Sequence, residues 1–204
     1  MPTSFSPGVL TKDWAWHDVQ TVARLRPGVS LQHANEAMAA SYAKLFAIPS
    51  TGLRFFTVYG PWGRPDMAYF SFTQNIVQGK PITVFNEGRM KRDFTWVEDC
   101  VSGILGALSK PPSAGDRYCV GNAPHRIFNI GNNRPEELLT FIELIEDALG
   151  QMAEKIMAPM APGDVEETWA DIALAQEIFG YDPQTPLSAG IPRFVQWYCD
   201  YHNI

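Results

Sequence analysis

The sequence predicts an α/β protein whose parallel sheet is incomplete. Stretches with helical periodicity alternate with short apolar runs, the pattern of a parallel sheet with helical crossovers. Two runs, Gly52–Val58 and Ile127–Ile130, have the apolar character of central strands buried on both faces. Two strands are too few for a stable doubly wound sheet, so we expect that strands which should extend and cover them are missing.

Composition excludes several classes of protein. The hydrophobic fraction of 46% and the charged fraction of 19% are those of a globular protein, and the net charge of −6 argues against nucleic acid and membrane partners. No apolar run is long enough for a membrane span, and no signal peptide is evident. Three scattered cysteines favour a reducing cytoplasm and, with histidines that lack ligand spacing, predict no metal site.

The first half of the chain begins with an irregular N-terminal arm, residues 1–28, which prolines and glycines interrupt. A helix is predicted over Ser30–Leu45, with the Ser30 hydroxyl as its N-cap. The strand Gly52–Val58 follows, then a helix over Met67–Gln78 and a short strand over Ile82–Phe85.

The second half continues the alternation. A glycine turn at Asn86–Gly88 precedes a helix that opens near Val97. After the strand Ile127–Ile130, Pro135 is expected in the first turn of a helix that ends at Gly150.

The last part of the chain predicts a strand over Met157–Ala161 and a short helix over Ala170–Phe179. The final helix opens after Thr185-Pro186, with Pro192 in its first turn, where the missing N–H costs little.

The stretch Arg54–Asp66 holds the residues most suited to binding a ligand. The predicted strand ends at Gly60-Pro61, and Arg64 and Asp66 follow in the loop just after it. Ligands of open α/β sheets bind beyond the carboxyl ends of strands, so this loop is a candidate binding segment. A core strand followed by an ordinary turn explains the same residues equally well.

Several motifs occur in an order and spacing that resemble one family. Together they look like the C-terminal half of an extended short-chain dehydrogenase/reductase of the NAD-dependent epimerase/dehydratase family, similar to UDP-glucuronate 4-epimerases, over about Val29–Tyr201. The resemblance implies an incomplete Rossmann-like sheet of C-terminal strands plus a small α/β substrate-binding region, both within residues 29–204. The motifs are Ala34-Asn35-Glu36, Gly52–Met67, Met90–Thr95, Phe128–Gly131 and Pro162-Gly163-Asp164.

The resemblance also implies a catalytic chemistry, but the residues that perform it in the family are missing from this sequence. In the family, an N-terminal half holds NAD through a Gly-rich turn, and the tyrosine of a Tyr-x-x-x-Lys pair takes the proton of the sugar 4-hydroxyl. Here no Gly-rich motif follows a strand. Gln32 stands in place of the lysine and Gly28 in place of the tyrosine, or else four residues including the tyrosine are deleted. We therefore assign no catalytic and no cofactor-binding residue, and expect the chain alone to be inactive and to bind no NAD.

The nucleotide-binding residues of the family are better matched. Arg92 corresponds to the arginine that binds the UDP diphosphate, for which a planar guanidinium is suited. The alternative is a surface pair of Arg92 with Asp93 or Asp99. Asp164 corresponds to the acid that contacts the ribose hydroxyls; the alternative is an ordinary turn aspartate.

Further matched residues surround the sugar. Thr57 and Arg64 correspond to residues near the sugar carboxylate, and an exposed loop arginine is the alternative for Arg64. Phe55 and Phe56 correspond to residues lining the nicotinamide, but here plain core packing is favoured.

Two short segments correspond to those that flank the phosphates and the uracil: Met67 with Ala68, and Thr83 through Phe85. Core packing is the alternative for Phe85.

Two functions remain open from the sequence. In the first, the chain binds a UDP-sugar, UDP-glucuronate or UDP-galacturonate, without converting it. In the second, it is an interaction module that pairs through the free edge of the strand Gly52–Val58, either as a homodimer or with a separate Rossmann half.

Overall fold

The computed structural model describes residues 30–204, and the predicted arm, residues 1–28, lies outside the described residues. Helices and strands alternate, as the sequence predicts. The helices are α1 (Leu31–Phe46), α2 (Ala68–Val77), α3 (Val97–Ser109), α4 (Leu138–Leu149), α5 (Ala173–Phe179) and α6 (Leu187–His202), with the 3-10 turn η1 (Asn86–Gly88). The strands are β1 (Ser50–Phe55), β2 (Thr57–Tyr59), β3 (Ile82–Phe85), β4 (Lys91–Trp96), β5 (His125–Ile130), β6 (Pro135–Glu137) and β7 (Lys155–Ala158).

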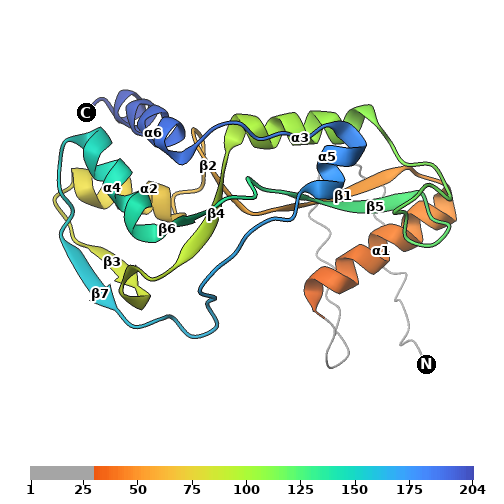
Figure 1. The fold of residues 1–204 in the computed structure, drawn as a ribbon, viewed down its shortest axis with the longest axis horizontal. Helices are drawn as coiled ribbons and strands as arrows, with labels where there is room; N and C mark the ends of the chain where they lie inside the picture. Colours follow the sequence, from red (N-terminus) through yellow and green to blue (C-terminus); the bar gives the residue numbers. More distant parts are fainter. Residues whose placement is uncertain (1–29) are drawn as a thin grey trace, which may run out of the picture.

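The elements form an elongated body with two ends (Figure 1). At one end, β1 and β5 pair in parallel, from Ser50 opposite His125 to Phe55 opposite Ile130. Helix α1 packs on one side of this pair, and α3 and α5 on the other (Figure 1). We call this end the β1–β5 layer.

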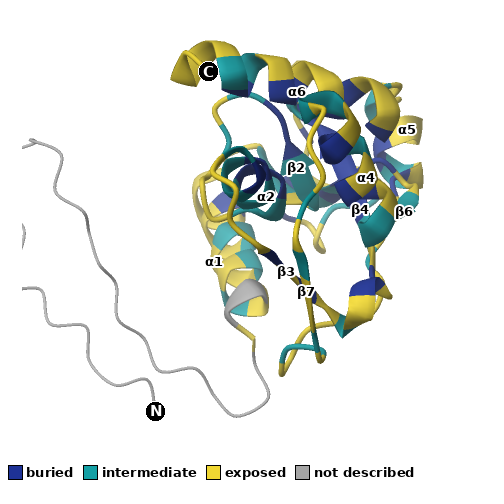
Figure 2. Ribbon diagram, turned by 90° about the vertical axis from the view of Figure 1, so that its left-hand side faces the viewer, coloured by how far each residue is buried: buried dark blue, intermediate teal, exposed yellow. Residues whose placement is uncertain are grey.

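The other end holds the remaining strands. β2 pairs in parallel with β4, β4 pairs antiparallel with β6, and β3 pairs in parallel with β7. Helices α2, α4 and α6 surround an aromatic core at this end, and α6 turns its buried side toward the other two (Figure 2). Within that core the rings of Phe94 and Phe141 stack 4.5 Å apart.

Local sequence signals are confirmed where they are strong. Ser30 caps α1, and its hydroxyl accepts a hydrogen bond from the His33 N–H at 3.2 Å. Gly150 ends α4 with φ +65°, a left-handed conformation that favours glycine. Gly88 in the predicted turn has φ +79°.

The predicted strand Gly52–Val58 is wrong in two respects. It is divided at Phe56 into β1, which pairs with β5, and β2, which pairs with β4. It is also not buried on both faces, since Phe55 is 50% exposed. The chain passes from one sheet to another at this point.

Long-range pairing overrides other local predictions. The sequence predicts no strand over Lys91–Trp96, but β4 forms there and lies between β2 and β6. Pro135 does not begin a helix; it begins β6, opposite Asp93. The strand expected over Met157–Ala161 lies earlier, in β7. Pro192 lies inside α6, beyond its first turn.

Candidate functional site

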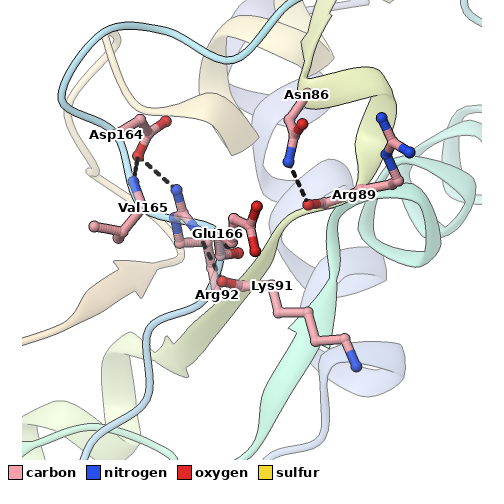
Figure 3. Close-up of polar contacts among 7 residues, drawn as sticks. All are labelled: Asn86, Arg89, Lys91, Arg92, Asp164, Val165 and Glu166. Carbon is pink, nitrogen blue, oxygen red and sulfur yellow. Dashed lines mark hydrogen bonds and ion pairs between the residues drawn. The ribbon is translucent and has the colours of Figure 1, made fainter.

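Two of the predicted site residues, Arg92 and Asp164, meet directly. The Arg92 guanidinium donates a hydrogen bond from Nη2 to Asp164 Oδ1 at 2.6 Å, although 72 positions separate them (Figure 3). Its Nη1 donates to the backbone carbonyls of Lys91 at 2.9 Å and Glu166 at 3.2 Å. The alternative that Arg92 pairs with Asp93 or Asp99 is therefore wrong.

The loop that carries Asp164 is fastened to β4. Asp164 Oδ1 also accepts the Val165 N–H at 2.9 Å. The Lys91 N–H donates to the Glu166 carbonyl at 2.8 Å, and the Thr168 N–H donates to the Lys91 carbonyl at 3.2 Å. The contacts of Arg92 and Asp164 thus belong to an ordered crossing of two chain segments.

Asp93, next to Arg92, has the opposite orientation because successive strand side chains alternate. Its buried carboxylate accepts backbone N–H groups of Asn132 at 2.6 Å, Asn133 at 2.9 Å and Ala170 at 2.8 Å. Burial raises the pKa of Asp93, and these hydrogen bonds partly offset that rise. Asp93 therefore joins β4 to the turn after β5 and to the segment before α5, which holds Arg92 in place.

Thr57 and Arg64 lie at and after β2. Thr57 is opposite Phe94 of β4, two positions beyond Arg92. Arg64 lies in the following loop and forms an ion pair with Asp66 at 2.8 Å, with both side chains mostly exposed. Its Nη2 also lies 3.7 Å from Met67 Sδ. Among the described residues, the side chains of Arg64 and Arg92 share no hydrogen-bond or ion-pair partner.

The two flanking segments have different surroundings. Met67 is the N-cap residue of α2 and Ala68 its first residue, and both pack partly against the core. Thr83 and Phe85 lie on the outward face of β3, where they alternate with buried residues. Phe85 is 42% exposed, so core packing does not explain it.

A groove of about 570 Å³ lies between α1 and the β1–β5 pair, and another of about 640 Å³ lies beyond the end of β1. The larger lies against Phe55, Phe56, Arg64, Met67 and α3. The structure thus places Arg64 and Met67 on one groove and Arg92 with Asp164 at a separate crossing, and joins them only through neighbouring strands β2 and β4.

The side chains of Arg92 and Asp164 are suited to binding a ligand. A guanidinium can hold phosphate oxygens, and a carboxylate can accept hydroxyl hydrogens. Within residues 30–204, no group of three His, Cys, Asp or Glu side chains could hold a metal ion. No helix of the described part is long and apolar enough to cross a membrane.

The sequence prediction missed Asp93 as a structural residue. Its signal was an acid directly before Phe94-Thr95-Trp96, a run that suits a strand. A charged residue in that position suggests a buried partner. The partners of Asp93 are three backbone N–H groups of distant segments, which the pattern of side chains does not reveal.

Comparison with known proteins identifies the family. The profile of the NAD dependent epimerase/dehydratase family matches residues 30–131, half of the chain. The chain belongs to this family. The resemblance inferred from the motifs is thereby confirmed.

The curated relatives of this epimerase-family chain are longer than the chain itself. A probable UDP-glucuronate 4-epimerase of Rhizobium meliloti (strain 1021) is 45% identical over 171 residues, which make up 80% of this chain and 50% of that protein. UDP-glucuronate 4-epimerase 1 of Arabidopsis thaliana is 46% identical over 177 residues, 83% of this chain and 41% of that protein. The chain therefore spans about half the length of the curated relatives it matches.

The fold is also shared with solved structures. The UDP-glucuronic acid 4-epimerase from Bacillus cereus, in complex with UDP-glucuronic acid and NAD, matches with a TM-score of 0.70 and 33% identity. The match covers 82% of this chain and 51% of that one. The mixed α/β fold with parallel strands thus corresponds to part of the Rossmann-type fold of the epimerases, as the sequence predicts.

Proposed function

We propose that this chain binds a UDP-hexuronate, UDP-glucuronate or UDP-galacturonate, with Arg92 on the diphosphate and Asp164 on the ribose. The contact of Arg92 with Asp164 at 2.6 Å is the observation that carries the proposal. Diphosphate and ribose are adjacent in UDP, so the residues that bind them must be adjacent too. A match of isolated motifs would not require two residues so far apart in sequence to meet.

Arg92 has donors left for a ligand. A guanidinium has five N–H groups, and the contacts within the described residues use Nη1 twice and Nη2 once. The Nε–H and one Nη2 hydrogen make none of these contacts and can donate to phosphate oxygens.

The remaining proposed binding residues serve the sugar and the base. We assign Thr57 and Arg64 to the sugar carboxylate, and the segment of Met67 and Ala68 to the phosphates. Thr83 and Phe85, which point outward from β3, receive the uracil.

We further propose that residues 30–204 hold no NAD by themselves, although structural relatives bind it. A pyrophosphate cradle needs glycines that leave room for close approach of the backbone. Gly60 and Gly131 follow strands β2 and β5, but a Cβ at Gly60 would lie 2.6 Å from Val97, and one at Gly131 2.2 Å from Ala170. Side chains of the protein itself fill both spaces, which supports binding without redox chemistry. We also propose a cytoplasmic location, because the three cysteines are scattered and odd in number.

Replacing Arg92 with alanine is expected to weaken UDP-glucuronate binding about 10- to 100-fold, the effect of losing a charged hydrogen-bond donor. Isothermal titration calorimetry measures it. Arg117→Ala is the matched control, since Arg117 pairs with Glu177 at 3.5 Å beside α5 and should leave the affinity unchanged. Absence of heat at millimolar ligand with the wild-type chain would refute the proposal.

Arg64→Ala is expected to reduce the preference for UDP-glucuronate over UDP-glucose by about fivefold, because an exposed ion pair contributes about 1 kcal/mol. Competition titration with both sugars measures the ratio. The control is Arg89→Ala, whose side chain is 73% exposed like that of Arg64 and pairs with Glu87 at 2.9 Å. An unchanged ratio in Arg64→Ala would remove Arg64 from the sugar site.

A further inference from the structure

The loop between β2 and α2, residues 60–67, contains a tryptophan in an unfavourable backbone conformation. Trp62 has φ +62°, in the left-handed region that residues other than glycine rarely adopt. Such a residue persists only where its surroundings hold it there. Trp62 is also 75% exposed, so burial of its side chain in the core is not what holds it.

The ring of Trp62 instead rests on two aromatic rings of α6. Its centroid lies 5.3 Å from that of Trp197 and 5.2 Å from that of Tyr201, in edge-on geometry. Trp197 and Tyr201 are four residues apart and so share one face of the helix, and their rings stack 5.3 Å apart. Trp197 also packs against the aromatic core. The exposed tryptophan thereby fastens the loop to a helix that belongs to the core.

The positions that follow Trp62 leave the backbone of Arg64 little freedom. A Cβ at Gly63 would overlap the hydroxyl of Tyr69, which is 2% exposed, so this part of the loop lies directly against α2. The Met67 N–H donates to the Arg64 carbonyl at 3.1 Å. The Arg64 side chain is 73% exposed and, within the described residues, hydrogen-bonds only to near neighbours in the loop. The backbone of the loop therefore sets the direction of the guanidinium.

We propose that Trp62 is a positioning residue, whose ring contacts with α6 fix the loop and so direct Arg64 toward the sugar carboxylate. This inference rests on the proposed function, because Arg64 serves a carboxylate only if the chain binds a UDP-hexuronate. A guanidinium on an ordered loop loses less conformational entropy when it binds. The preference for a uronate over a neutral hexose therefore depends on two rings of α6, although α6 carries none of the residues assigned to the sugar.

Competition titration of UDP-glucuronate against UDP-glucose, with UDP alone as the reference, tests the proposal. Trp62→Ala is expected to lower the preference for UDP-glucuronate about threefold, with the affinity for UDP within about twofold of the wild type. Trp62→Phe keeps an aromatic ring and should retain most of the preference, whereas Tyr201→Ala should lower it from outside the loop. The control is Tyr42→Ala, at an aromatic residue of α1 that is 59% exposed.

A double substitution tests whether Trp62 acts through Arg64. If it does, adding Trp62→Ala to Arg64→Ala causes no further loss of preference, because the residue that Trp62 positions is already gone. Hydrogen exchange measured by NMR tests the loop without a ligand. The Met67 N–H should exchange about tenfold faster in Trp62→Ala than in the wild type, and at the wild-type rate in Trp62→Phe and Tyr42→Ala.

The outcomes separate this inference from the proposed function. A wild-type chain that binds no UDP-glucuronate would refute both. A wild-type preference that Arg64→Ala removes but Trp62→Ala retains would overturn the role of Trp62 alone. The same holds for a further loss in the double variant, for unchanged exchange at Met67 in Trp62→Ala, and for a loss of UDP affinity as large as the loss of UDP-glucuronate affinity.

Discussion

Replacing Asp93 with alanine is expected to lower the free energy of unfolding by about 3–5 kcal/mol, because several buried N–H groups lose their acceptor at once. Those donors are the backbone N–H groups of Asn132, Asn133 and Ala170. They belong to the turn after β5 and to the segment before α5, both of which donate to the Asp93 carboxylate. Urea unfolding followed by tryptophan fluorescence measures the loss, with Trp96 as a buried reporter.

The pH dependence should distinguish Asp93 from an ordinary surface acid. Burial raises its pKa in the folded state, so the folded state binds more protons and stability falls as pH rises from about 4, the unfolded-state pKa, through the folded-state pKa. This part of the slope should vanish in Asp93→Ala. The control is Asp182→Ala at an exposed residue, expected within about 0.5 kcal/mol of wild type; an equally small effect in Asp93→Ala would contradict the assignment.

Replacing Gly190 with alanine is expected to destabilise the chain by about 1–3 kcal/mol through overpacking. In an open helix, the same change would stabilise by up to about 1 kcal/mol. Here a Cβ at Gly190 would lie 2.0 Å from the Tyr59 hydroxyl and 2.7 Å from its Cζ, and Tyr59 is fully buried. The sign of the effect, read from urea unfolding, therefore tests the packing of α6 on β2.

A second substitution identifies the cause. Tyr59→Phe removes a buried hydroxyl that has no partner in the described residues, so we expect it alone to be nearly neutral and to recover part of the loss in Gly190→Ala. Ser188→Ala, at an exposed position of α6, is the control for helix propensity. If Gly190→Ala were stabilising, Tyr59 and α6 would not pack as described.

The sequence predicted those parts of the fold that depend on neighbouring residues. Ser30 caps α1 through a hydrogen bond only three residues away, and Gly150 ends α4 through its own φ. The apolar stripes of α3 and α4 predicted where these two helices lie in the sequence. In each case, the physical cause lies within a few positions of the signal.

The remaining predictions failed where distant segments decide the structure. The charged residues Lys91 and Arg92 do not suggest a strand, and the strand conformation of β4 comes from its pairing with β2 and β6. Pro135 favours a helix start locally, but pairing with Asp93 makes it part of a strand. Likewise, nothing local shows that Phe56 marks the change from one sheet to another.

The candidate site was predicted by motif and could not have been assembled from local signals. Arg92 and Asp164 each had an ordinary surface explanation, and only the crossing of the loop over β4 brings them together. Conversely, the position of Arg64 apart from that contact was not foreseen, since the motif fixes residue order but not distance. The buried role of Asp93 depends on backbone donors that no residue type reveals.

The central claim is that Arg92 holds the diphosphate of a UDP-sugar, and ³¹P NMR of UDP-glucuronate tests it most directly. Adding the wild-type chain should shift and broaden both phosphorus resonances, and Arg92→Ala should abolish this effect while Arg117→Ala retains it. Resonances that respond equally to the wild type and to Arg92→Ala would show that the phosphates bind elsewhere, and unchanged resonances with the wild type would contradict nucleotide-sugar binding altogether.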